Sequence, residues 1–399
     1  MDNLTHSIIG AAVARILPER FRRPEIYWAS VIANNLPDAD VVVRFFPGAT
    51  TFDYLIQHRG YSHTFLAAPV LGLASAAIAK RATRAPRWTL ELALIGILGS
   101  LLHVGADFLN NYGVHPLTPF ENRWFYGDSV YIVEPLLWFA LVPLLVREAG
   151  RAWSRIAWAM LGLSMLALVW LFPMFTNGLA WALTAFFALS AVLAAKFRGP
   201  ALGRIVPVAF FVAAIGAFVA AGVRARAVAE TDWRENAGSE KLLDLASNPA
   251  PGNPACWGVW IAARTPTEFR FYALDISLFP DAFPVDGCAT GSPVTHTAIY
   301  EKASYRPSSA IRWNGLVRIP VAEFERYREK SPLFRRLLSY SRFPFIREYP
   351  DGHAIAGDLR YDREEGVGFT EVEIPATGEA TPTDESRNSP WDPPFHSDE

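Results

Sequence analysis

Long apolar segments dominate the first 223 residues of the chain. Three of them contain no charged residue: 156–172, 179–195 and 205–223. Three more contain few ionisable side chains: 64–79, 88–107 and 130–146. Each approaches the about 20 apolar residues that a helix needs to cross a bilayer, and six in series are hard to explain without lipid. The pattern therefore predicts about six long membrane spans.

Two shorter apolar segments, 4–17 and 25–36, lie at the N-terminus and are separated by Pro18 and Pro24. At 1.5 Å per residue the first helix would be about 21 Å long, which is short for a hydrocarbon core of about 30 Å. We therefore expect a hairpin of two short N-terminal helices, either inserted in the membrane or re-entrant.

The pattern changes from about residue 224. Segments such as WGVWIAA, EFRFYALDISL, HAIAGDLRYD and VGFTEVEI indicate strands, whereas 321–341 looks helical. The last segment, 376–399, is rich in Pro, Thr, Ser and acidic residues, which predicts a disordered tail. The expected fold class is an all-α polytopic membrane helical bundle over 1–223 with a C-terminal extramembrane α+β domain over 224–375. Cys256 and Cys288 lie in that domain, and either a disulfide or two unpaired buried thiols would suit them.

Basic residues predict the orientation of the spans. Lys and Arg gather in the connections 19–23, 80–87, 147–155 and 196–204, which we expect to be cytoplasmic. The alternate connections then face the other side of the membrane: 37–63, 108–129 and 173–178. The C-terminal domain follows them to that side, although Arg224 and Arg226 after the last span go against the rule.

Composition narrows the function classes. The net charge of −2 argues against a basic nucleic-acid-binding surface, so no nucleic-acid partner is expected. Two cysteines cannot build a disulfide framework or a Cys-rich zinc module. The bilayer itself is the partner that the composition implies, because only 19% of the residues are charged and 51% are hydrophobic.

Ionisable residues lie beside apolar helices in the N-terminal third, and such residues are functional candidates by default. Seven of them could bind metal and map to one side of the predicted topology: His6, Asp38, Asp40, His58, His63, His103 and Asp107. Imidazole and carboxylate are the ligands of catalytic zinc, and the His103–Asp107 pair, four residues apart, shares one helix face. Such a set could hold one or two divalent ions, zinc or alternatively manganese, and two ions could serve phosphoester hydrolysis.

Two further residues are candidate catalytic groups. Arg59 lies between His58 and His63 and could pair with a phosphate or carboxylate of a substrate, or could extend to lipid headgroups. Glu134 begins the apolar segment VEPLLW.

The order of the blocks LTHSIIGAAVAR, NNLPDAD, HRGYSHTFL, HVGADFLNNYG and VEPLLW resembles the membrane-bound metal-dependent hydrolase family of YdjM-like inner-membrane proteins, over about residues 1–140. The resemblance implies a multi-pass protein of the bacterial inner membrane, and the orientation predicted from the basic residues then places the C-terminal domain in the periplasm. The family often has Asp where this chain has Glu134. A more distant similarity to zinc-dependent phospholipases C implies one metal on Asp38 or Asp40, His58 or His63, His103 and Asp107, and a second on His6 with Asp107.

The leading hypothesis is an integral-membrane metal-dependent hydrolase that uses a metal-activated water on a phosphoester of a lipid or envelope molecule. One alternative is a transporter of metal ions or protons, in which intramembrane His and Asp are equally natural. Another is a non-catalytic scaffold with a structural metal. Because every candidate ligand precedes residue 140, we expect the C-terminal domain to be dispensable for metal binding.

Overall fold

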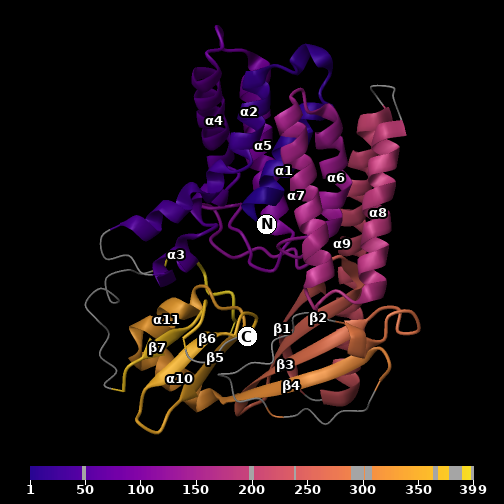
Figure 1. Ribbon diagram of the computed structural model, residues 1–399. Coiled ribbons are helices and arrows are strands. Elements are labelled where there is room, and N and C mark those ends of the chain that lie inside the picture. Colours follow the sequence, from indigo (N-terminus) through magenta and orange to yellow (C-terminus); the bar gives the residue numbers. More distant parts are fainter. Residues whose placement is uncertain are drawn as a thin grey trace.

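The computed structural model describes residues 1–46, 51–196, 202–237, 240–288, 301, 308–362, 367–376 and 389–396. A helical bundle forms one half of the molecule and two antiparallel sheets form the other (Figure 1). The N-terminus lies at the end of the bundle that faces the sheets.

Nine α-helices and three short 3-10 helices make up the described part of the first half. Their bounds are α1 Asn3–Ile16, η1 Glu19–Phe21, α2 Pro24–Ala33, η2 Leu36–Phe45, α3 Thr51–Gln57, η3 Tyr61–His63, α4 Ala67–Thr83, α5 Leu90–Phe108, α6 Pro135–Glu148, α7 Ala152–Leu171, α8 Asn177–Lys196 and α9 Leu202–Ala237. The short helices α1 and α2 agree with the predicted N-terminal pair. Their starts follow from local chemistry: the Asp2 carboxylate caps α1, and α2 begins at Pro24.

Four helices are long and apolar enough to cross a membrane: α5, α7, α8 and α9. A fifth span is possible if Phe52–His63 and Ala67–Thr83 count as one, although they meet at an angle of 84°. Six long spans are therefore not confirmed among the described residues. The segment predicted over 130–146 is the 14-residue helix α6, because Glu134 caps it and Pro135 begins it.

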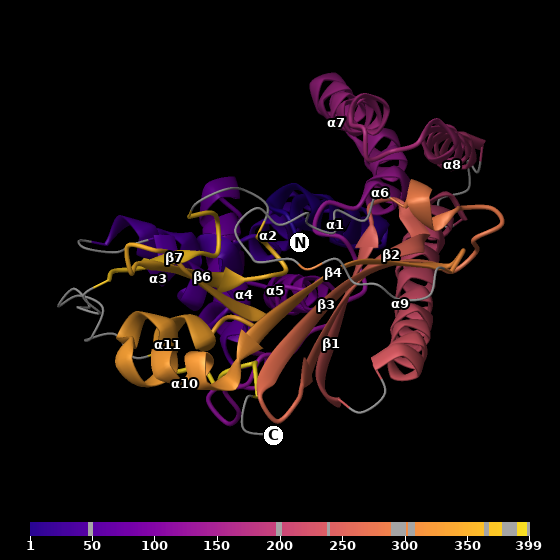
Figure 2. The same cartoon turned by 90° about the horizontal axis from the view of Figure 1, so that it is seen from below.

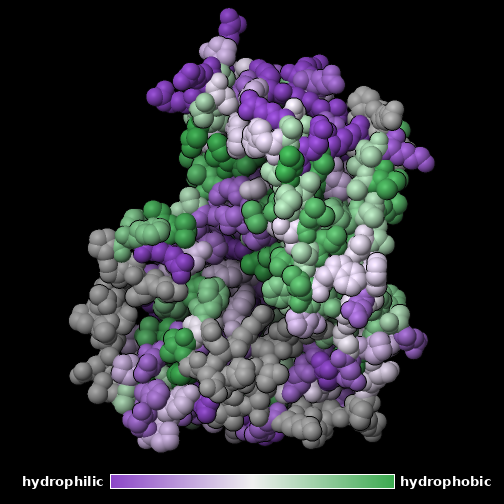
Figure 3. Space-filling model, in the orientation of Figure 1, coloured by the Kyte–Doolittle hydropathy of each residue, from purple (hydrophilic) through white to green (hydrophobic). Residues whose placement is uncertain are grey.

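The bundle has two chemically different ends. In Figure 1 the α1–α2, α4–α5 and α6–α7 connections lie at the end far from the sheets. In Figure 3 a hydrophilic cap covers that end, and a band of hydrophobic residues lies below it. Three of the four basic connections predicted from the sequence, 19–23, 80–87 and 147–155, thus share one end of the bundle, and the sheets lie against the other. Most of the fourth, 196–204, lies outside the described residues.

Two sheets and two helices build the C-terminal half. Their bounds are β1 Lys241–Ala250, β2 Asn253–Arg264, β3 Glu268–Ser277, β4 Ile311–Pro320, α10 Val321–Lys330, α11 Pro332–Leu338, β5 Pro344–Glu348, β6 Ala354–Asp358 and β7 Val372–Ile374. The first sheet has the order β1-β2-β3-β4 and the second β5-β6-β7, with antiparallel neighbours throughout. From below, the first sheet lies between α9 and the α10–α11 pair (Figure 2).

Two features of this half refine the sequence predictions. The helix α9 continues to Ala237 rather than ending near residue 223. Its last turns contain polar residues, but they still pack Ala225, Ala229 and Trp233 into the core. Cys256 and Cys288, for which two states were open, are joined by a disulfide.

The segment expected to be a disordered tail contains residues that pack tightly. Trp391 and Phe395 are buried in the same apolar cluster as Phe269, Phe324 and Phe345. The polar composition of 376–399 hides these two anchors, so the expectation of disorder does not hold for residues 389–396.

Candidate metal centre

Close helix packing brings the candidate ligands together. A Cβ atom on Gly10 would lie 2.8 Å from the Ser30 carbonyl oxygen, and one on Gly99 would lie 2.7 Å from the Ala33 Cβ. Only glycine allows α1, α2 and α5 to approach this closely. The chain leaving α2 therefore enters η2 directly beside the C-terminal part of α5.

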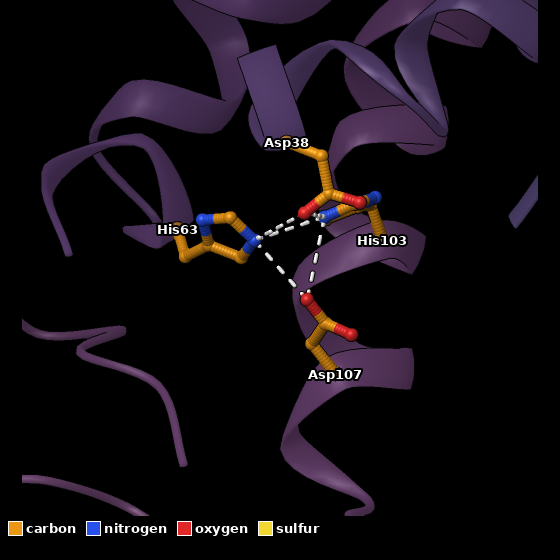
Figure 4. Close-up of side chains that lie close together, drawn as sticks. All are labelled: Asp38, His63, His103 and Asp107. Atoms are coloured by element: carbon orange, nitrogen blue, oxygen red, sulfur yellow. Dashed lines mark hydrogen bonds and ion pairs between the residues drawn. The ribbon is translucent and has the colours of Figure 1, made fainter. Parts of the chain in front are cut away.

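Asp38, His63, His103 and Asp107 form the first group, which contains four of the seven predicted ligands (Figure 4). His63 Nε2 lies 3.0 Å from His103 Nε2, 3.1 Å from Asp107 Oδ2 and 3.4 Å from Asp38 Oδ1. His103 Nε2 lies 3.5 Å from Asp38 Oδ1 and 3.4 Å from Asp107 Oδ2. Neighbouring donors around a tetrahedral zinc ion at 2.0–2.1 Å are about 3.3 Å apart, so these separations fit such an ion.

Each imidazole of the first group makes a hydrogen bond through its Nδ1 atom, and this bond fixes Nε2 as the atom that faces the group. His103 Nδ1–H donates to the Asn34 carbonyl oxygen over 2.7 Å. Ser62 donates its hydroxyl to Asp40 and so accepts from His63 Nδ1–H over 2.9 Å. Metal-binding histidines are typically oriented in this way. Both Nε2 lone pairs then point inward toward two carboxylate oxygens, and four converging acceptors repel one another unless a cation lies between them.

A second group, Asp38, Asp40 and His58, shares Asp38 with the first. His58 Nδ1 lies 2.9 Å from Asp40 Oδ1, while Asp40 Oδ2 accepts from the Arg59 backbone N–H over 3.0 Å. The His58 and Asp40 side chains are 14% and 10% exposed, whereas His63, His103 and Asp107 are fully buried. Solvent therefore reaches the centre from the side of the second group.

The carboxylates of η2 are prepared for a cation. Burial alone would raise the pKa of Asp38, but in the absence of a cation a proton on the adjacent His103 or His63 Nε2 atom holds it well below its usual range. Burial opposes ionisation of Asp40 in the same way, and the His58 and Arg59 contacts hold its pKa below the ordinary value.

The other oxygen of Asp107, Oδ1, is contacted by nitrogen atoms of three residues. His6 Nε2 lies 3.2 Å and Arg59 Nη2 3.1 Å from Asp107 Oδ1, and the Met1 amino group contacts it as well. Arg59 also donates to Asn110 Oδ1 over 2.7 Å. Arg59 is buried, so it does not extend to lipid headgroups. Neither His6 nor Arg59 belongs to a candidate metal group; both orient Asp107.

Glu134 lies apart from both groups. Its Oε1 accepts the backbone N–H of Leu136 over 3.0 Å, and both carboxylate oxygens lie 3.1 Å from the Gly252 nitrogen. Burial raises the pKa of Glu134 to about 8. The catalytic role expected for Glu134 is not supported by this placement, because its carboxylate caps α6 and fixes the β1–β2 turn.

Several residues near the site could not be found by looking for metal ligands. Asn34, Ser62 and Asn110 act through their contacts with His103, His63 and Arg59. Each lies within or next to a block that carries a candidate ligand or its helix, and that proximity is the only signal in the sequence.

The C-terminal segment also contacts the ligand-bearing loop. Trp391 Nε1 donates to the Ile56 carbonyl oxygen over 2.7 Å. A Cβ atom on Gly60 would lie 2.4 Å from the Trp391 ring, and the His115 and Trp391 rings are stacked with centroids 3.9 Å apart. The loop that carries His58 and His63 is therefore covered by a residue more than 300 positions later in the chain.

Comparison with known proteins agrees with the arrangement of the N-terminal half. Residues 1–180 match the model of the YdjM inner membrane protein family. No curated protein and no solved structure matches the chain. Two of the four apolar helices, α5 and α7, and the ordered His and Asp blocks fall within the matched region, so residues 1–180 of this chain are similar to the YdjM inner membrane protein family.

Proposed function

We propose that the protein is an integral-membrane metal-dependent hydrolase. The observation that carries this proposal is the convergence of four acceptor atoms from Asp38, His63, His103 and Asp107, which a divalent cation would balance. Because Asp38 also belongs to the group with Asp40 and His58, the donor set suits two ions.

The protein's own residues have distinct roles in this proposal. Asp38, His63, His103 and Asp107 would hold one ion, and Asp38, Asp40 and His58 would hold the other. Arg59 and His6 bind the outer oxygen of Asp107 and so orient its inner oxygen. Zinc fits the mixed imidazole and carboxylate set, with manganese as an alternative. When bound, such ions act as Lewis acids and lower the pKa of water.

The substrate class follows from position. The centre is built on η2, η3 and the C-terminal end of α5, the end opposite to the α4–α5 connection, and its second group is partly exposed. A phosphoester of a lipid or of another envelope molecule could reach this level of the membrane. Its negative oxygens would be attracted to a divalent centre.

One observation favours a structural metal instead. The four residues of the first group are enough to fill a tetrahedral coordination sphere, and a closed sphere is typical of structural zinc. The partly exposed second group distinguishes the two functions, because His58 contributes no atom to the first group and a purely structural site there has no need of it.

Activity assays separate these functions. Detergent-purified full-length protein loaded with zinc or manganese is expected to hydrolyse at least one member of a phosphodiester, phosphomonoester and carboxylester panel. Asp40→Asn and His58→Ala are expected to lower the rate of hydrolysis by about 100-fold or more, the size of a typical general acid–base contribution. Both variants are expected to retain the ion of the first group. His396→Ala, at an exposed histidine far along the chain, is the matched control. Full metal loading without turnover of any ester would favour the structural role.

The orientation is a separate prediction. We infer that the basic connections are cytoplasmic and that the sheets lie in the periplasm, where the Cys256–Cys288 disulfide would be stable. At residues near 240 and 375, a fused reporter that works only in the periplasm is expected to be active. A reporter that works only in the cytoplasm is expected to be inactive at the same positions. Cytoplasmic activity of both reporters would reverse the orientation and place the metal centre on the inner side.

A further inference from the structure

A second polar feature of the membrane half is not explained by the metal centre. Arg224 and Arg226 follow the most apolar span on the side where basic residues are disfavoured. Arg226 is accounted for by hydrogen bonds to the Asp128 carbonyl oxygen and the Ser247 hydroxyl. Arg224 is exposed, its guanidinium carbon lies 6.0 Å from the centre of the Phe279 ring, and no carboxylate among the described residues pairs with it.

Arg224 lines an apolar cavity of about 560 Å³ between the bundle and the first sheet. The walls come from α6, α8 and α9, from the β1–β2 turn and from the segment after β3. The lining residues include Leu136, Leu183, Ala220, Gly252, Phe279 and Phe283. This volume is within the about 300–1,000 Å³ of typical ligand sites. Apart from Arg224 and the neutral Asn253, the lining side chains are apolar, so the occupant needs an apolar body and an anionic group.

The depth of Arg224 in the bilayer identifies that occupant. Arg204 and Arg224 lie 20 positions apart on α9 without an intervening charge, a rise of about 30 Å and thus one hydrocarbon thickness. The two guanidinium groups therefore lie at opposite headgroup layers. Arg204 also lines an apolar cavity, but Glu148 lies 3.5 Å from it. Arg224 has no such described partner, so its charge is left for a ligand.

We propose that this cavity binds one anionic phospholipid of the bilayer, with an acyl chain between α8 and α9 and its phosphate on Arg224. The lipid-facing surfaces of α8 and α9 are continuous with the cavity walls, because most of each span is not buried in the protein. The exposed rings of Phe279 and Phe283 lie at the level where aromatic residues anchor at an interface. The cavity shares no residue with the two metal groups, so this inference does not depend on the proposed hydrolase activity.

Lipid titration of the delipidated full-length protein, followed by native mass spectrometry, tests the site. Phosphatidylglycerol is expected to bind at one molecule per chain, at least about tenfold more tightly than phosphatidylcholine. Arg224→Gln is expected to remove this preference, and Ala220→Trp, which fills the cavity, is expected to weaken binding of both lipids. Arg224→Lys keeps the charge and is expected to retain part of the preference.

Arg234→Gln is the matched control, because Arg234 lies on the same helix and is already paired with Glu230. It is expected to bind both lipids as the unchanged protein does. Equal binding of the two lipids by the unchanged protein would overturn the proposal, as would an unchanged preference in a folded Arg224→Gln protein. Thermal unfolding of each variant in the same detergent shows whether it is folded.

Discussion

Replacing His103 with alanine is expected to remove the metal of the first group while the protein remains folded. His103 contributes one of the four converging acceptors, and its Nε2 lies within 3.5 Å of the other three ligand atoms. Asp107→Ala is expected to have the same effect, because its Oδ2 faces both imidazoles. The unchanged protein should carry at least one tightly bound divalent ion per chain, measured by inductively coupled plasma mass spectrometry after reloading with zinc or manganese.

Variants around the group separate ligands from supporting residues. His6→Ala leaves all four converging acceptors in place but removes a contact to Asp107 Oδ1, so metal affinity is expected to fall by about 10–100-fold rather than to disappear. His353→Ala, in the β5–β6 hairpin, is the control that should change nothing. A reloaded, folded protein that binds no ion would leave the His103–Asp107 pair as a structural contact and would remove the basis of the hydrolase proposal.

Lowering the pH is expected to weaken metal binding. Each imidazole ligand must be neutral to bind a cation, so protons compete with the metal. Affinity should therefore be full above the range in which histidine titrates and should decline as the pH falls through it. Metal release that does not depend on pH would indicate that the carboxylates alone hold the ion.

The sequence was most informative where one chemical rule acts over a short segment. Apolar length located α5, α7, α8 and α9, and period-two alternation located β2 and β3. The i, i+4 spacing correctly placed His103 and Asp107 on one helix face. These features depend only on neighbours within a few residues, which a single sequence displays.

Features that depend on contacts between distant segments were not visible. Asp38 and Asp40 were equal candidates in the sequence, and only the packing of η2 beside α5 makes Asp38 common to both groups. Glu134 had the right chemistry, but its carboxylate is used by the Gly252 backbone 118 residues away. Trp391 lay in a segment of disordered composition, although it covers the loop around Gly60.

The same limitation affects the expectation that the C-terminal domain is dispensable for metal binding. Arg342, after α11, donates to Asp128 Oδ2 over 2.8 Å and to both carboxylate oxygens of Asp244. Asp128 belongs to the connection after α5, and its backbone N–H donates to the Asn110 carbonyl oxygen. Asn110 in turn accepts from Arg59. A chain of contacts thus links the C-terminal half to the residues that orient Asp107.

Arg342 remains charged in this buried position. Burial alone would lower its pKa, but Asp128 and Asp244 raise it well above the ordinary arginine value. Removing one partner from a buried ion pair leaves an uncompensated charge, which typically costs about 3–5 kcal/mol. Arg342→Met is therefore expected to lower the free energy of unfolding by about that amount, measured by SDS titration in mixed micelles.

Arg326→Met is the matched control, because Arg326 pairs with Glu348 at the surface and such pairs contribute about 0–1 kcal/mol. Adding Asp128→Asn and Asp244→Asn to Arg342→Met should recover part of the loss, since no buried carboxylate is then left without its partner. If the link to Asn110 and Arg59 supports the centre, Arg342→Met should also lower metal affinity under conditions where it is still folded, whereas Arg326→Met should not. An Arg342→Met protein that is destabilised but binds metal as tightly as before would show that the two halves are energetically independent, as the position of the ligands in the sequence first indicated.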